Sequence, residues 1–150
     1  MSDNELQRTR PGFARRLAAE LSVRRALEAD LKIVGLDHVQ LAMPADQEAR
    51  ARHFYVGLLG LIEVQKPAHL AARGGAWFED ADVKIHLGVD PEFRPAQKAH
   101  PGLLVSNLQG LMEALGSAGH AVVDGEPLAG YKHAYVNDPF GNRLELMERT

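Results

Sequence analysis

The sequence predicts an α+β fold made of two tandem βαβββ modules that follow an N-terminal helix. Two stretches, 77–87 and 135–146, each indicate a strand, a turn opening at an aspartate, and a second strand with a polar residue inside an apolar alternation. Each is preceded by an apolar strand that carries a histidine. If one module is used twice, His38 and His86 of the first copy correspond to His100 and Glu145 of the second.

Composition limits the functions that the chain can have. Its 150 residues correspond to one domain, or to two small modules that share a core. There is no cysteine, so a metal would have to bind through imidazole and carboxylate groups. A net charge of −3 gives no reason to expect nucleic-acid binding. Without a long apolar run or a secretory signal, no membrane partner and a cytoplasmic location are expected.

Residues 1–32 differ in character from the rest and are predicted to form a helical extension. A frayed start should lead into a helix from Gly12 to Asp30, in which Phe13, Leu17 and Leu21 approximate an apolar stripe. Two interpretations remain open. The helix either covers a partner subunit or a site, or it is a solvated amphipathic helix outside the core, and the second is favoured.

The remainder, 33–150, is predicted to hold the modules at about 33–89 and 99–149. In the first module we expect a strand over 33–43, a helix from 44–46 to Gly60, a strand over 61–65 and a hairpin of 76–79 with 83–89. A proline-containing linker spans 90–98. In the second we expect a strand over 100–106, a helix from Leu108 to Gly116 or Gly119, a strand over 121–123 and a hairpin of 132–137 with 143–148.

Strand parity places the candidate ligands on one kind of face. Successive side chains of a strand point to opposite faces. His86 therefore lies opposite Ile85 and Leu87, and Glu145 lies opposite Leu144 and Leu146. Two such sheets side by side would direct four ligand-type residues into one cleft, namely His38, His86, His100 and Glu145. This set suits a divalent zinc, nickel, manganese, cobalt or iron ion.

The start Leu36-Asp37-His38-Val39 and the ending from Asp138 to Leu146, Asp-Pro-Phe-Gly-Asn-Arg-Leu-Glu-Leu, resemble the vicinal oxygen chelate superfamily over about 34–147. That group includes glyoxalase I, fosfomycin-resistance thiol transferases, methylmalonyl-CoA epimerase, extradiol dioxygenases and the metal-free bleomycin-resistance proteins. The resemblance implies an open, cup-shaped barrel around a metal, commonly in a homodimer. It matches His38, His100 and Glu145 to a two-histidine, one-carboxylate set. His86 falls where glyoxalase I has a glutamate and the epimerase a glutamine.

The resemblance favours a metal-dependent lyase, isomerase or transferase that chelates a small oxygen-rich substrate through two oxygens. The alternatives are a metal-free binding protein of the bleomycin-resistance kind and a small extradiol-type dioxygenase. Glu145 and His86 are the groups available for proton transfer, and His86 is either a fourth ligand or a base. Six further residues are candidates for substrate binding: Trp77, Tyr131, His133, Tyr135, Arg94 and Arg143. The rings could equally pack the barrel, Arg94 could lie in a solvated linker, and Arg143 could pair with an acid.

Overall fold

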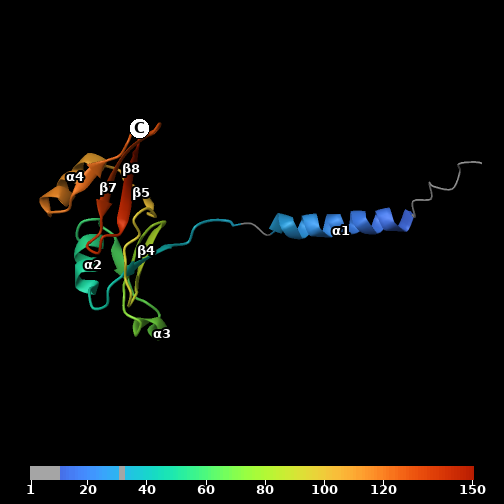
Figure 1. Ribbon diagram of the computed structural model, residues 1–150, viewed down its shortest axis with the longest axis horizontal. Coiled ribbons are helices and arrows are strands. Elements are labelled where there is room, and N and C mark those ends of the chain that lie inside the picture. The colour runs from blue at the N-terminus through green and yellow to red at the C-terminus, as the bar shows by residue number, and fades with distance from the viewer. Residues whose placement is uncertain (1–10, 31–32) are drawn as a thin grey trace, which may run out of the picture. The chain divides into compact units, whose positions relative to one another are not determined.

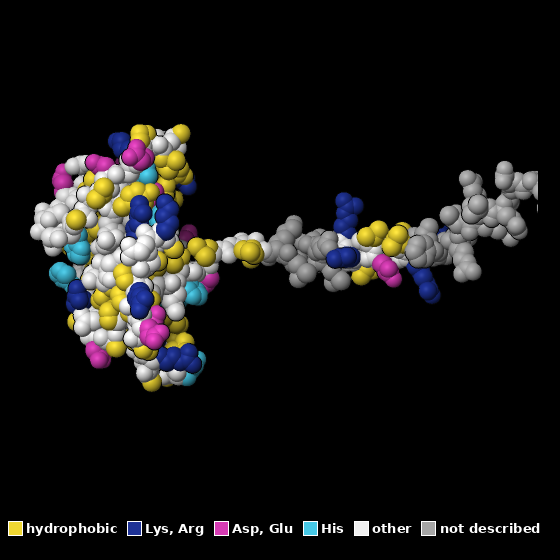
Figure 2. Space-filling view, viewed as in Figure 1, with side chains coloured by type: hydrophobic (Ala, Val, Ile, Leu, Met, Phe, Trp, Pro, Cys, Tyr) yellow, Lys and Arg dark blue, Asp and Glu magenta, His cyan; other side chains and the backbone are white. Residues whose placement is uncertain are grey.

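The computed structural model describes residues 11–30 and 33–150, which fall into two compact units that divide between Leu36 and Asp37. The first unit contains the predicted N-terminal helix, α1 (Pro11–Asp30). Its apolar stripe is weak, because Val23 projects from the side opposite Leu17 and Leu21, and all three are exposed. Figure 2 shows hydrophobic and charged side chains mixed along it. The frayed start lies in 1–10, outside the described residues.

The second unit has the predicted doubled architecture (Figure 1). The first module consists of β1 (Val39–Met43), α2 (Glu48–Tyr55), β2 (Ile62–Val64), α3 (Ala68–Ala71), β3 (Trp77–Asp80) and β4 (Val83–Val89). The second consists of β5 (Gly102–Leu104), α4 (Leu108–Ser117), β6 (Val122–Asp124), β7 (Tyr131–Asn137) and β8 (Arg143–Arg149). The strand orders are β1-β4-β3-β2, called sheet A here, and β5-β8-β7-β6, called sheet B. The two curled sheets do not close into a barrel, and the predicted fold is confirmed.

The first and last strands of each module lie side by side and parallel. This pairing places the segment before β1 beside the start of β4, and the segment before β5 beside the start of β8. The strand expected from Ile33 begins only at Val39, because the residues before Val39 have no partner strand. His38 and His100 therefore precede their strands instead of lying within them. Helix α3 was not expected, since four residues are too few to produce a helical period.

One apolar core joins the two modules. The predicted inward residues Ile85, Leu87, Leu144 and Leu146 are all buried in one cluster, together with Phe54 of α2. In Figure 1, α2 and α4 lie on the same side of the strands. The opposite face of each sheet, which carries His86 in sheet A and Glu145 in sheet B, therefore points away from this core. None of the described helices is long and apolar enough to cross a membrane.

A buried carboxylate holds the modules together at the turn between β7 and β8. Asp138 is 4% exposed, and its Oδ1 accepts hydrogen bonds from the backbone N–H groups of Phe140 (2.9 Å) and Asn142 (2.8 Å). Its Oδ2 accepts from the Tyr55 hydroxyl (2.9 Å) and the Asn142 amide (2.8 Å). The same amide donates to the Ala42 carbonyl at 2.8 Å. Burial, followed by the Asp138 charge, raises the pKa of Tyr55 well above its ordinary value, so the phenol remains a donor.

Replacing Tyr55 with phenylalanine should lower the free energy of unfolding by about 1–3 kcal/mol, because a buried carboxylate loses a donor. Urea unfolding followed by circular dichroism measures this. Tyr131→Phe, at a half-buried position on β7, is the matched control and should change stability by less than about 0.5 kcal/mol. Equal stabilities of the two variants would show that this bond does not hold the modules together.

Candidate functional site

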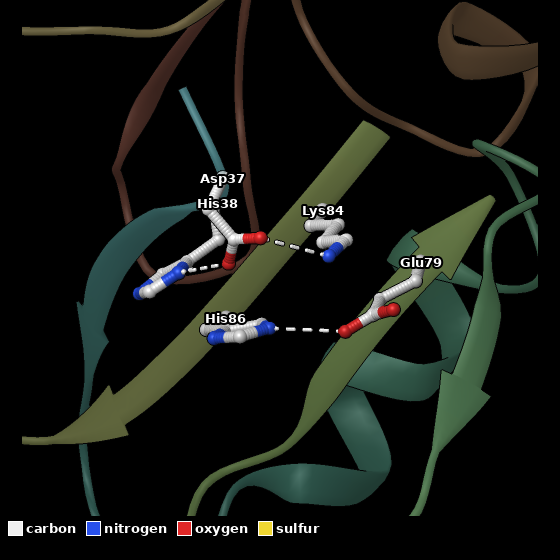
Figure 3. A network of polar contacts seen from close by, with 5 residues as sticks. All are labelled: Asp37, His38, Glu79, Lys84 and His86. Carbon is white, nitrogen blue, oxygen red and sulfur yellow. Dashed lines mark hydrogen bonds and ion pairs between the residues drawn. The ribbon is translucent and has the colours of Figure 1, made fainter. Parts of the chain in front are cut away.

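The outward face of sheet A carries a fixed pair of histidines (Figure 3). His38 Nδ1 lies 2.9 Å from a carboxylate oxygen of Asp37, whose other oxygen accepts from Lys84 at 3.0 Å. A carboxylate can only accept, so the His38 proton lies on Nδ1 and the Nε2 lone pair is left free. Hydrogen bonds from His38 and then Lys84 lower the pKa of Asp37.

His86 lies in a stack of three rings. Trp77 covers one of its faces at a centroid distance of 4.1 Å, and His38 lies at 4.3 Å on its other side. The His86 side chain is almost fully buried, and its Nε2 lies 3.2 Å from the Glu79 carboxylate. That contact places the proton on Nε2 and leaves Nδ1 as the basic nitrogen. The stack and the carboxylate together fix the orientation of the ring.

The outward face of sheet B is centred on Glu145. Its Oε1 accepts from the Tyr135 hydroxyl at 3.0 Å and from His133 Nδ1 at 2.5 Å. The other nitrogen of His133 donates to the Glu126 carbonyl at 2.6 Å. Both partners of His133 are acceptors, so the two contacts favour the protonated form of the ring. Oε1 is fully occupied by these donors, and Oε2 is the oxygen left to bind something else.

His100 faces that second oxygen. Its Nδ1 lies 2.7 Å from the Lys98 carbonyl, so Nδ1 is the protonated nitrogen. Its Nε2 is 3.4 Å from Glu145 Oε2. Two ligands each about 2.1 Å from an ion, at a tetrahedral angle, are themselves about 3.4 Å apart. The pair therefore has the spacing of two ligands that share one ion.

The electrostatics of sheet B favour an ionised carboxylate. Burial raises the pKa of Glu145, but the hydrogen bonds from Tyr135 and His133, followed by the contact with His100, outweigh it, so the pKa lies below its ordinary value. The bond to Glu145 is the main cause of the raised pKa of Tyr135. Arg143 stacks on the Tyr135 ring, with its guanidinium carbon 3.8 Å from the ring centroid.

The structure brings the four predicted ligands together as two pairs, His38 with His86 on sheet A and His100 with Glu145 on sheet B. Within the described residues of one chain, no group of three or more His, Cys, Asp or Glu side chains has a metal-binding arrangement. One chain therefore presents the four residues as two separate pairs, which are called half-sites below.

The other predicted site residues differ in their surroundings. Trp77 stacks on His86, whereas His133 and Tyr135 bond to Glu145, and His133 also lines a cavity of about 440 Å³. Tyr131 lies further along the same face of β7, and Arg94 is exposed in the linker after β4. Sequence reasoning missed the two carboxylates that orient histidines, Asp37 and Glu79. The adjacency of Asp37 to His38 could have indicated the first, but only the strand register indicates the second.

The pKa of His133 should lie above its ordinary value of 6.5, because of the bond to the Glu126 carbonyl first and the bond to Glu145 after it. Its stabilising contribution is then fully present below about pH 6.5 and is lost as the pH rises through the folded-state pKa. Titration of the ring proton signals by NMR in the metal-free protein measures this value. Glu145→Gln should lower the pKa of His133. An unchanged titration midpoint in this variant would contradict the hydrogen bond between His133 and Glu145.

Comparison with known proteins agrees with this architecture. A glyoxalase family protein from Bacillus anthracis is 41% identical, with a TM-score of 0.76 over 79% of this chain and 98% of that one. The fosfomycin resistance protein FosX from Listeria monocytogenes is 15% identical and shares the fold. The match has a TM-score of 0.64 and covers 79% of this chain and 96% of FosX. An antibiotic binding protein from Streptomyces is 20% identical and also shares the fold. That match has a TM-score of 0.58 and covers 79% of this chain and 100% of the other. A search of curated proteins finds no match. Residues 35–146 match the model of the Glyoxalase/Bleomycin resistance protein/Dioxygenase superfamily, and the chain belongs to this superfamily.

Proposed function

We propose that this protein is a metal-dependent enzyme of the glyoxalase type, which binds a small oxygen-rich substrate through two adjacent oxygens. The single observation that carries the proposal is the pairing of His100 Nε2 with Glu145 Oε2 at 3.4 Å, each with its other polar atom already hydrogen bonded. A bound divalent ion would stabilise negative charge on the substrate oxygens as a Lewis acid. Lyase, isomerase and transferase chemistry all use this stabilisation.

The protonation of the histidines supports a metal site. A histidine that binds a metal usually donates its other ring N–H to a carboxylate or a carbonyl, which fixes the ring and its tautomer. His38 does this to Asp37, and His100 does it to the Lys98 carbonyl. In each ring, Nε2 is the nitrogen that remains to bind a metal. With Glu145, they form a set of two imidazoles and one carboxylate, which suits zinc, nickel, cobalt, manganese or iron.

The separation of the half-sites supports a site shared between two copies of the chain. Among the described residues of one chain, the pair on sheet A and the pair on sheet B do not form one common group. A second copy could place its sheet A over sheet B of the first, and a twofold axis would then create two equivalent sites. We therefore propose a homodimer in which His38 comes from one subunit, and His100 and Glu145 come from the other.

His86 is better suited to moving a proton than to binding the metal. Its Nε2 is engaged by Glu79 and its ring is clamped between Trp77 and His38, so Nδ1 has a fixed direction. An imidazole beside a carboxylate is a suitable base near neutral pH. We assign His86 as the general base and Glu79 as the residue that positions it. His133 and Tyr135 position Glu145 in the same way.

Removing a ligand should abolish metal binding. His100→Ala and Glu145→Ala each leave too few ligands, and calorimetry with zinc should show a loss of at least about 100-fold in affinity. His53→Ala, on the exposed side of α2, is the matched control and should bind zinc normally. His86→Ala should retain zinc while losing turnover. If the wild-type protein binds no metal, the sequestration function of the bleomycin-resistance kind replaces this proposal.

Mixing two inactive variants tests the shared site. His38→Ala and Glu145→Gln should each lack metal binding alone. A mixed dimer should regain one intact site, because one subunit supplies His38 and the other supplies Glu145. With random exchange, half of the dimers are mixed and half of their sites are intact, so about a quarter of wild-type zinc binding should return. No recovery, with subunit exchange verified by mass spectrometry, would place all ligands within one chain.

A further inference from the structure

The connection between β2 and β3 breaks the internal repeat. In the second module the corresponding connection, 125–130, contains no helix, whereas 65–76 contains α3. An extra segment on a rigid scaffold commonly determines what a site accepts. This one adjoins the half-site on sheet A, because it leads directly into Trp77.

A cavity of about 260 Å³ lies between α3 and the outward face of sheet A. Gln40, Trp77 and Gly88 contribute to it from the same face as His86. Gln40 pairs with His86 in the strand register, and Trp77 stacks on the His86 ring, so the cavity and the proposed base share a wall. A Cβ at Gly88 would lie 2.8 Å from Gln40 Nε2, so the glycine leaves room for that amide.

The cavity is lined by two cationic side chains, Lys66 and Arg73. The Lys66 ammonium donates to the Gly74 carbonyl. Glu48, whose Oε1 accepts from the Gly75 N–H at 2.7 Å, does not line the cavity. Among the described residues that line it, the charged side chains are these two cations, so the lining is positively charged. Figure 2 shows Lys or Arg side chains at the end of the molecule where Figure 1 labels α3.

The loop that forms the cavity is held in place before any ligand arrives. Gly74 and Gly75 have φ angles of +69° and +78°, a region that favours glycine. A Cβ at Gly75 would lie 2.1 Å from the Leu87 carbonyl oxygen, so only glycine lets the loop close onto β4. The next residue, Ala76, exchanges two backbone hydrogen bonds with Leu87. A preorganised cationic cavity loses little entropy when it binds an anion.

We infer that this cavity is a subsite for an anionic group of the substrate, a carboxylate, phosphonate or phosphate, at the end remote from the two chelating oxygens. Arg73 provides the main charged contact and Trp77 forms the wall. The inference rests on the proposed metal site for the position of the other end of the substrate. It narrows the substrate class to small molecules that carry a chelating oxygen pair and a separate anionic group.

Two probes of equal chain length test the subsite. 2-Hydroxyglutarate and 2-hydroxypentanoate both offer a hydroxyl and a carboxylate oxygen for chelation, but only the first has a terminal carboxylate. Trp77 is the sole tryptophan, so its fluorescence reports binding directly. The zinc-loaded protein should bind 2-hydroxyglutarate about tenfold more tightly or better. Arg73→Gln should remove most of that preference.

Lys132→Gln, which removes one exposed charge on the opposite face of β7, is the control and should keep the preference. Equal wild-type affinity for both probes, or a preference unchanged in Arg73→Gln, would overturn the subsite while leaving the metal site intact.

A second experiment, with phosphate as the probe, does not need the metal. Inorganic phosphate should change Trp77 fluorescence in the metal-free protein, and Arg73→Gln should lose that response. Failure of zinc binding would reject the proposed function, but the phosphate experiment would still test the subsite. If phosphate does not change the fluorescence of the wild-type protein, the subsite is overturned.

Discussion

The architecture depends on the buried carboxylate of Asp138. Such a group is tolerated in a protein interior only when donors satisfy it, and four of them do so here. Two of the four are backbone N–H groups of its own turn, which fixes the start of β8. The Tyr55 hydroxyl comes from the other module, and the Asn142 amide also reaches the end of β1 at Ala42. One network therefore sets the turn, the register of β8 and the contact between the modules. Glu145 lies three residues after Asn142 on β8, so this network also fixes the position of Glu145.

Parallel pairing of the first and last strand in each module is what creates the half-sites. It joins chain segments that are far apart in sequence and places a histidine from the start of a module beside a polar residue near its end. The two half-sites differ in how they are held. Ring stacking and the Glu79 carboxylate fix His86, whereas hydrogen bonds from His133 and Tyr135 fix Glu145. The first leaves Nδ1 of His86 outside these contacts, and the second leaves Oε2 of Glu145 outside them.

These two environments suit complementary tasks under the proposed function. A carboxylate with a lowered pKa stays ionised and can bind a cation over a wide pH range, which is what a metal ligand needs. An imidazole oriented by a carboxylate can accept a proton near neutral pH. Sheet A also carries the α3 insertion with Lys66 and Arg73, whereas sheet B has no counterpart helix. Under the proposed function, sheet B therefore supplies two of the three metal ligands, whereas sheet A supplies the third ligand, the base and the substrate subsite.

The module order, the hairpins and the face on which each strand residue lies could all be predicted from the sequence alone. These features depend on turn residues and on a period of two, which are local properties of the chain. The pairing of Glu79 with His86, and of His133 with Glu145, depends on the tertiary structure. Cross-strand neighbours depend on register, and the register follows from the packing of both modules around one core. That core also directs the two ligand faces outward, so the four ligand-type residues that the sequence placed in one cleft occur as two pairs on one chain.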